Sequence, residues 1–129
     1  MSGRFLPPDH SRGDANTIGG YAAVHARPAA FEGADGMSYS VEIVVDETGM
    51  PDRPFGAYLL FLRWRRVGAQ GIEGHLETDY LSYGGTEETA RDAVEKMTLN
   101  AVKGLLDDLV REQSANRPTR RWWDAMRDE

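Results

Sequence analysis

The stretch "FGAYLLFLRWRRV", Phe55 to Val67, decides the fold because it contains no charged residue before Arg63. A long helix is the alternative, but its aromatic residues and the flanking Pro54 and Gly68 favour a β-strand. As a strand it is apolar on both sides, with Phe55, Ala57, Leu59 and Phe61 on one and Tyr58, Leu60, Leu62 and Trp64 on the other. Such a strand is typical of the middle of a sheet whose two faces are both covered.

Three further segments are predicted as strands around this one. "SYSVEIVVDE", Ser38 to Glu47, alternates with a period of two, and "ETGMPDRP" then forms a hairpin loop into Phe55. After "GAQG" the chain returns as a strand over Ile72 to Tyr80. "GYAAVHAR", Gly20 to Arg27, is predicted as a short strand that Pro28 ends, and "FEGADGM" as a turn.

From Thr86 the hydrophobic period changes to 3.6, which predicts a helix with Thr86 as its N-cap. One apolar stripe runs through Ala90, Val94, Met97, Ala101, Leu105 and Leu109. The predicted fold is therefore α+β, an antiparallel β-meander of three to four strands with one long C-terminal helix packed on one face. We divide the chain into an irregular arm (1–19), a single domain (20–113), and a linker with a tryptophan-bearing tail (114–129).

The composition excludes several classes of protein. The 129 residues carry a net charge of −6 and no cysteine, which excludes disulfide scaffolds and thiol nucleophiles and leaves a cytoplasmic location as the natural expectation. No apolar run approaches the roughly 20 residues of a membrane span, and the first residues lack the apolar core of a secretory signal. Because phosphate contacts need gathered Lys and Arg, the acidic balance also argues against nucleic acid as a partner.

The sequence contains no motif that indicates catalysis. It lacks G-x-S-x-G, a phosphate-binding loop and G-x-G-x-x-G. We therefore expect no enzyme activity, no cofactor and no identifiable small-molecule substrate.

The spacing Glu73, His75, Glu77, Asp79 raises the alternative of a metal site. Alternate residues of a strand lie about 7 Å apart, so all four cannot share one ion. At most His75 and Glu77 chelate together, with His25 as a further ligand if the two predicted strands pair. The competing interpretation is that these side chains form the hydrated face of an antiparallel strand, and the sequence favours it.

The excess of apolar surface on segment 55–66 points to an interaction module: an adaptor, an assembly subunit or an acidic inhibitor of a basic protein. One helix covers only one face of a sheet, so the chain's own tail, another protein or a second copy must cover the rest. Tryptophan is enriched at binding hot spots. The candidate partner-binding residues are Trp64, Trp122, Trp123, Arg120 and Arg121. For Trp64, packing in the chain's own core is the alternative.

Overall fold

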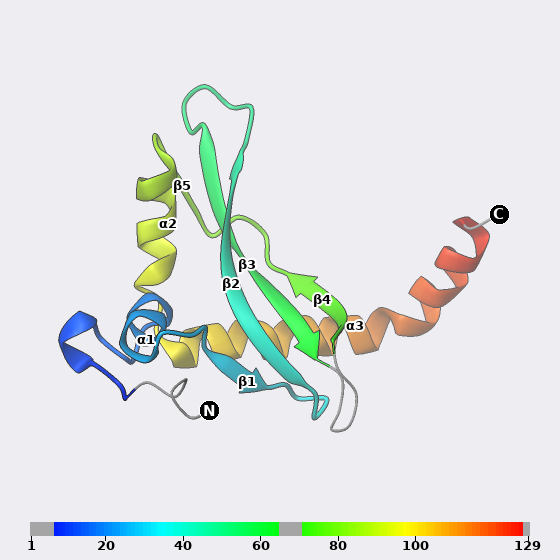
Figure 1. The fold of residues 1–129 in the computed structure, drawn as a ribbon. Coiled ribbons are helices and arrows are strands. Elements are labelled where there is room, and N and C mark those ends of the chain that lie inside the picture. The colour runs from blue at the N-terminus through cyan, green and yellow to red at the C-terminus, as the bar shows by residue number, and fades with distance from the viewer. Residues whose placement is uncertain (1–6, 65–70, 128–129) are drawn as a thin grey trace.

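The computed structural model describes residues 7–64 and 71–127, with side chains as far as Gln113. Three helices and five strands follow a short 3₁₀ turn within these residues (Figure 1). In chain order they are η2 (His10–Arg12), α1 (Ile18–His25), β1 (Ala30–Glu32), β2 (Ser38–Glu47), β3 (Phe55–Trp64), β4 (Ile72–Glu77), β5 (Ser82–Gly84), α2 (Glu87–Glu95) and α3 (Leu99–Arg127).

The strands form one open antiparallel sheet, and β3 lies in its middle. The order is β1-β2-β3-β4, with β5 also paired to β3. On one side of β3 lies β2, in register from Ser38 opposite Trp64 to Glu47 opposite Phe55. On the other side β4 pairs with Leu60 to Trp64 and β5 with Phe55 to Ala57. The predicted α+β class, the antiparallel sheet and the strand over Phe55 are confirmed.

The hydrophobic core lies on one face of this sheet, where all three helices pack (Figure 1). Leu59 and Phe61 of β3 are 0% exposed, as are Val102 and Leu106 of α3. α1 contributes Ile18, and α2 contributes Ala90 and Val94. Each of the buried Leu, Ile, Val and Phe side chains stabilises the fold by roughly 1.5–3 kcal/mol, so docking on the sheet holds the helices in place.

The expected single long helix is wrong, because the chain divides it into α2 and α3. Thr86 does begin α2, and its hydroxyl accepts from the backbone N–H of Thr89. At the break, Ile18 donates its N–H to the carbonyl of Met97, and Leu99 donates to the carbonyl of Asn16. Backbone groups that would continue the helix are thus satisfied by the N-terminal segment. The Thr98 hydroxyl then accepts from the N–H of Ala101 and caps the first turn of α3.

The strand predicted over Gly20 to Arg27 is also wrong, since these residues lie mostly in α1. The Thr17 hydroxyl caps the helix by accepting from the N–H of Gly20. The alanines of α1 are strong helix formers. α1 packs closely on α2, because a Cβ at Gly19 would lie 2.6 Å from the Cβ of Glu95. The packing of α1 on α2 therefore outweighs the strand-like alternation of side chains over Gly20 to Arg27.

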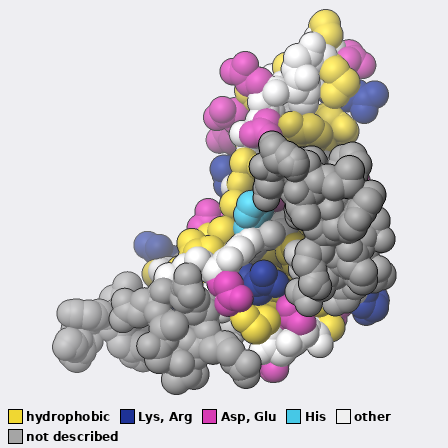
Figure 2. Space-filling view, turned by 90° about the vertical axis from the view of Figure 1, so that its right-hand side faces the viewer, with side chains coloured by type: hydrophobic (Ala, Val, Ile, Leu, Met, Phe, Trp, Pro, Cys, Tyr) yellow, Lys and Arg dark blue, Asp and Glu magenta, His cyan; other side chains and the backbone are white. Residues whose placement is uncertain are grey.

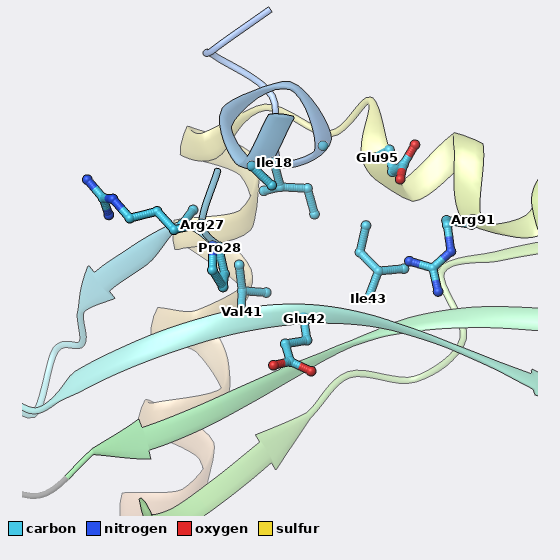
Figure 3. A pocket seen from close by; sticks show the side chains of 11 residues that line it. Ile18, Arg27, Pro28, Val41, Glu42, Ile43, Arg91 and Glu95 are labelled. Atoms are coloured by element: carbon cyan, nitrogen blue, oxygen red, sulfur yellow. The ribbon is translucent and has the colours of Figure 1, made fainter. Parts of the chain in front are cut away.

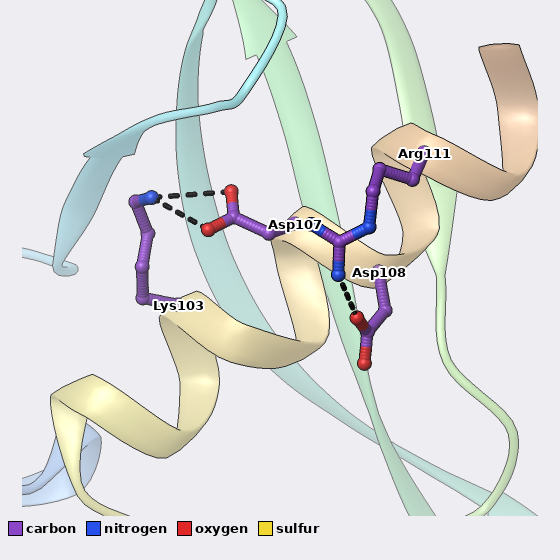
Figure 4. Close-up of polar contacts among 4 residues, drawn as sticks. All are labelled: Lys103, Asp107, Asp108 and Arg111. Carbon is purple, nitrogen blue, oxygen red and sulfur yellow. Dashed lines mark hydrogen bonds and ion pairs between the residues drawn. The ribbon is translucent and has the colours of Figure 1, made fainter.

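Ion pairs lie along the outer surface of α3 (Figure 4). Lys103 Nζ lies 2.8 Å from Asp107 Oδ2, and Arg111 pairs with Asp108. Both pairs are partly or fully exposed, so each contributes only a few tenths of a kcal/mol.

The backbone of α3 continues through residues 114–127, the segment predicted as linker and tail. At the other end of the described chain, Ile18 of the predicted arm is buried in the core. The division of the chain into arm, domain and tail stays a prediction. Of the helices in the described ranges, none combines the length and the apolar character that a bilayer crossing requires.

Candidate functional site

The sheet face opposite the helices is the candidate functional site, and we call it the open face. Side chains of cross-strand partners point to the same side of a sheet. The register therefore places Leu62 beside Ser40 and His75, and Leu60 beside Glu42 and Glu77. The open face comprises Ser40, Glu42, Val44 and Asp46 of β2, Tyr58, Leu60, Leu62 and Trp64 of β3, and His75 and Glu77 of β4.

An apolar stripe follows β3 along the open face. Val44, Leu60 and Leu62 are partly exposed, and none belongs to the core cluster or packs against it. Trp64 closes one end of the stripe with 38% of its surface exposed. Its indole N–H donates to Ser40 Oγ at 2.9 Å, which holds the ring across β2. Trp64 therefore lies at the surface, and the alternative of a core tryptophan is excluded.

His75 and Glu77 lie together on this face, with 3.5 Å between Nε2 and Oε2. Both side chains are about half exposed, as expected for a hydrated strand face. His25 is not brought to them: it lies on α1, where its ring packs against those of Tyr21 and His10. Asp79 lies beyond the end of β4. Among the side chains described, no three His, Asp or Glu residues gather closely enough to hold a metal ion.

Four of the predicted partner-binding residues lie at the far end of α3. The backbone of Arg120, Arg121, Trp122 and Trp123 is helical, but their side chains fall outside the described residues. Their role in binding stays a prediction.

A cavity of about 410 Å³ opens on the open face at the other end of β3 from Trp64. Three tyrosines and three acidic residues line it: Tyr58, Tyr80, Tyr83, Asp46, Glu77 and Asp79. We call it the tyrosine pocket. Tyr80 lies over Gly56, where a Cβ would come within 2.7 Å of its ring. The glycine in the middle of the sheet thus makes room for an aromatic wall.

The polar groups of the tyrosine pocket are carboxylates and neutral hydroxyls. The Tyr80 hydroxyl donates to Asp46 Oδ2 at 3.2 Å. Partial desolvation raises the pKa of Tyr58 above its ordinary value, and the charges of Asp46 and Glu77 raise it further. Desolvation is also the largest cause that raises the pKa of Tyr80, and the negative charge of Asp46 is the next largest. Tyr58 and Tyr80 therefore stay protonated at neutral pH and add no charge of their own to the pocket.

Comparisons of the chain with protein-family models, with curated proteins and with solved structures found no match.

A second cavity of about 380 Å³ lies between α1, α2 and β2. Ile18, Val41 and Ile43 give it apolar walls, and Arg91 of α2 reaches toward it (Figure 3). Figure 3 also shows that Arg27 and Glu42, although part of its lining, point away from it. Its walls continue the hydrophobic core, so we read it as a gap at the margin of the core and assign it no function.

Trp64, His75 and Glu77, which the sequence singled out, lie on the open face, but the sequence did not indicate the tyrosine pocket. Tyr80 lies in the connection between β4 and β5, Tyr83 lies in β5, and Asp46 lies far away in the chain on β2. The only signal was the density of tyrosine in "TDYLSYGG". Nothing local to that segment indicates that β5 returns to pair with Phe55, Gly56 and Ala57.

Proposed function

We propose that the protein is an interaction module whose open face binds an extended, basic segment of another protein. It serves as an adaptor, an assembly subunit or an inhibitor of that basic protein, in the cytoplasm and without catalysis of its own. The observation that carries the proposal is the one-sided core: three helices pack on one face of the sheet, while the other face presents Leu60, Leu62 and Trp64.

The apolar stripe supplies the hydrophobic part of this binding. Val44, Leu60 and Leu62 are only partly exposed, so an extended segment laid along β3 would remove their remaining surface from water. Each Å² of apolar surface buried contributes roughly 25 cal/mol. Trp64, the largest exposed ring of the stripe, is of the type that dominates binding hot spots.

The charge of the open face favours a basic occupant. Glu42, Asp46 and Glu77 lie beside the apolar stripe, and the whole chain carries a net charge of −6. Figure 2 shows acidic and hydrophobic side chains next to one another on the described surface seen from the β4 side. A segment that alternates basic and apolar residues would match both features and would be steered toward the face by its charge.

Two short peptides test the proposal, one alternating Lys with Val and one with Glu in place of every Lys. We expect the Lys peptide to bind the full chain and to shift the backbone resonances of Leu60 and Leu62 and the indole N–H of Trp64. The Glu peptide should leave these signals unchanged. Rising salt should weaken the binding, because the attraction is between exposed charges.

A matched pair of variants locates the binding. Leu62→Lys adds a positive charge within the stripe, and Ala93→Lys adds one on the exposed side of α2. Leu62→Lys should abolish binding of the Lys peptide, because it removes the apolar contact and repels the peptide, whereas Ala93→Lys should preserve it. Equal binding of both peptides, or equal loss in both variants, would overturn the proposal. So would a dimer in light scattering that Leu62→Lys dissociates, because the occupant would then be a second copy.

A further inference from the structure

We propose that the tyrosine pocket binds an alkylammonium group, the kind carried by a lysine side chain or a small quaternary amine. The inference rests on the proposed function in one respect, because a basic segment on the open face is the expected source of that group. The pocket lies on the same face as the apolar stripe, at the end of β3 opposite Trp64.

The rings of the pocket form angled walls. The centroids of Tyr58 and Tyr80 lie 5.9 Å apart with planes at 68°, and those of Tyr80 and Tyr83 lie 5.6 Å apart at 56°. Because the three rings are tilted relative to one another and not stacked in parallel, their faces and edges can line a shared space. A cation within about 6 Å of a ring centroid is attracted by the negative face of the ring.

The acids add a full negative charge that the described part of the chain does not neutralise with Lys or Arg. Glu77 pairs there only with His75, and neither Asp46 nor Asp79 pairs with a described cation. Carboxylates beside aromatic faces favour a ligand that is both positively charged and partly apolar. An alkylammonium group meets this requirement, because its methyl or methylene groups contact the rings while its charge faces the acids.

One of the rings already binds a cation from the chain itself. The guanidinium carbon of Arg53, in the loop between β2 and β3, lies 4.9 Å from the ring centroid of Tyr83. Arg53 pairs with Asp52 at 3.8 Å rather than with a pocket acid. Tyr83 therefore already makes one cation–π contact within the fold. The cavity of about 410 Å³ falls within the range of roughly 300–1,000 Å³ typical of small-molecule sites.

Choline and its uncharged isostere 3,3-dimethylbutanol test the pocket on the full chain. Choline should shift the ring resonances of Tyr58, Tyr80 and Tyr83 in a saturable way, and the alcohol should not. Tyr58→Leu should weaken choline binding by about tenfold, whereas Tyr58→Phe, which keeps the ring, should stay within about twofold. Asp46→Asn should weaken it by about two- to fivefold, while Asp92→Asn on the exposed side of α2 should not.

The Lys peptide separates failure of the pocket from failure of the proposed function. If choline binds and the peptide does not, the inference holds with a small free amine as the ligand, and the proposed function fails. If the peptide binds the stripe but is insensitive to Tyr58→Leu and Asp46→Asn, the proposed function stands and the inference is overturned. Equal binding of choline and the alcohol, or binding of neither, also overturns the inference. Asp46→Asn keeps an acceptor for the Tyr80 hydroxyl, so the variant should fold, and a thermal melt matching that of the wild type separates loss of binding from unfolding.

Discussion

Tyr39 joins the core of the protein to a polar cluster at the end of the sheet. The residue is fully buried, and its hydroxyl donates to Asp35 Oδ2 at 2.7 Å. Arg63 Nη1 lies 3.9 Å from the same carboxylate oxygen. Burial raises the pKa of Tyr39, and the hydrogen bond to Asp35 raises it further. The folded state therefore holds the proton of Tyr39 more tightly than the unfolded chain does.

This difference predicts a loss of stability at alkaline pH. The unfolded chain releases the tyrosine proton near pH 10, about the ordinary pKa of tyrosine, while the folded protein retains it to higher pH. Stability due to Tyr39 is thus complete below pH 10 and is lost as pH rises through the raised pKa. Tyr39→Phe should cost about 1.5–3 kcal/mol at pH 8 through the lost hydrogen bond to a carboxylate.

Denaturant unfolding of both proteins from pH 8 to 11 checks this prediction. The difference in unfolding free energy between the wild type and Tyr39→Phe should narrow above pH 10. A difference that stays constant across the range would show that Tyr39 ionises alike in the folded and unfolded chain.

Single residues also show how far local sequence patterns reach. Thr86 was predictable as a helix cap, because its hydroxyl needs only the residues that follow it. Thr98 caps α3 in the same way, but nothing near it indicates that residues 16–18 interrupt the helix there.

At the scale of the element, β3 has two faces with different energetic roles. Leu59 is 0% exposed and lies in the core under the helices. Leu62 is partly exposed on the open face. Both leucines belong to the same central strand, so they share the same backbone environment. Truncating each of them therefore compares the two faces directly.

Leu59→Ala should lower the free energy of unfolding by about 2–5 kcal/mol, because it leaves a cavity in a packed core. Leu62→Ala should lower the free energy of unfolding by only about 1 kcal/mol, because Leu62 buries less apolar surface than Leu59 in the folded protein. Thermal or urea unfolding of the two variants measures the difference. Equal losses would mean that the open face is as tightly covered as the core, which would remove the main support for the proposed function.

At the scale of the whole molecule, α3 continues past the part of the chain whose side chains are described. Val110 is the last buried residue among the side chains described, while the backbone of α3 continues to Arg127. Residues 114–127 therefore extend the helix past the last described core residue. The predicted partner-binding residues Trp122 and Trp123 belong to this extension.

Truncation after Gln113 should leave the domain folded, with a melting temperature within about 3 °C of the full chain. If Trp122 and Trp123 belong to the interface, the truncation should also weaken binding of the Lys peptide. The double substitution of both tryptophans by alanine in the full chain is the control, because it removes the rings without shortening the helix. A truncated chain that no longer unfolds cooperatively would place residues 114–129 in the core.

The sequence by itself determined the strands β2, β3 and β4, the central position of Phe55 to Trp64 and the acidic, motif-free character of the chain, but not the short strands β1 and β5. These features follow from local periodicity and composition, and apolar residues on both sides of one strand are enough to indicate its place. Only the tertiary structure decided that Gly20 to His25 form a helix, that α2 and α3 are separate, and that Tyr58, Tyr80, Tyr83 and Asp46 share a pocket. Each of these depends on contacts between segments distant in the chain, whose gain in buried surface and satisfied hydrogen bonds outweighs local preference.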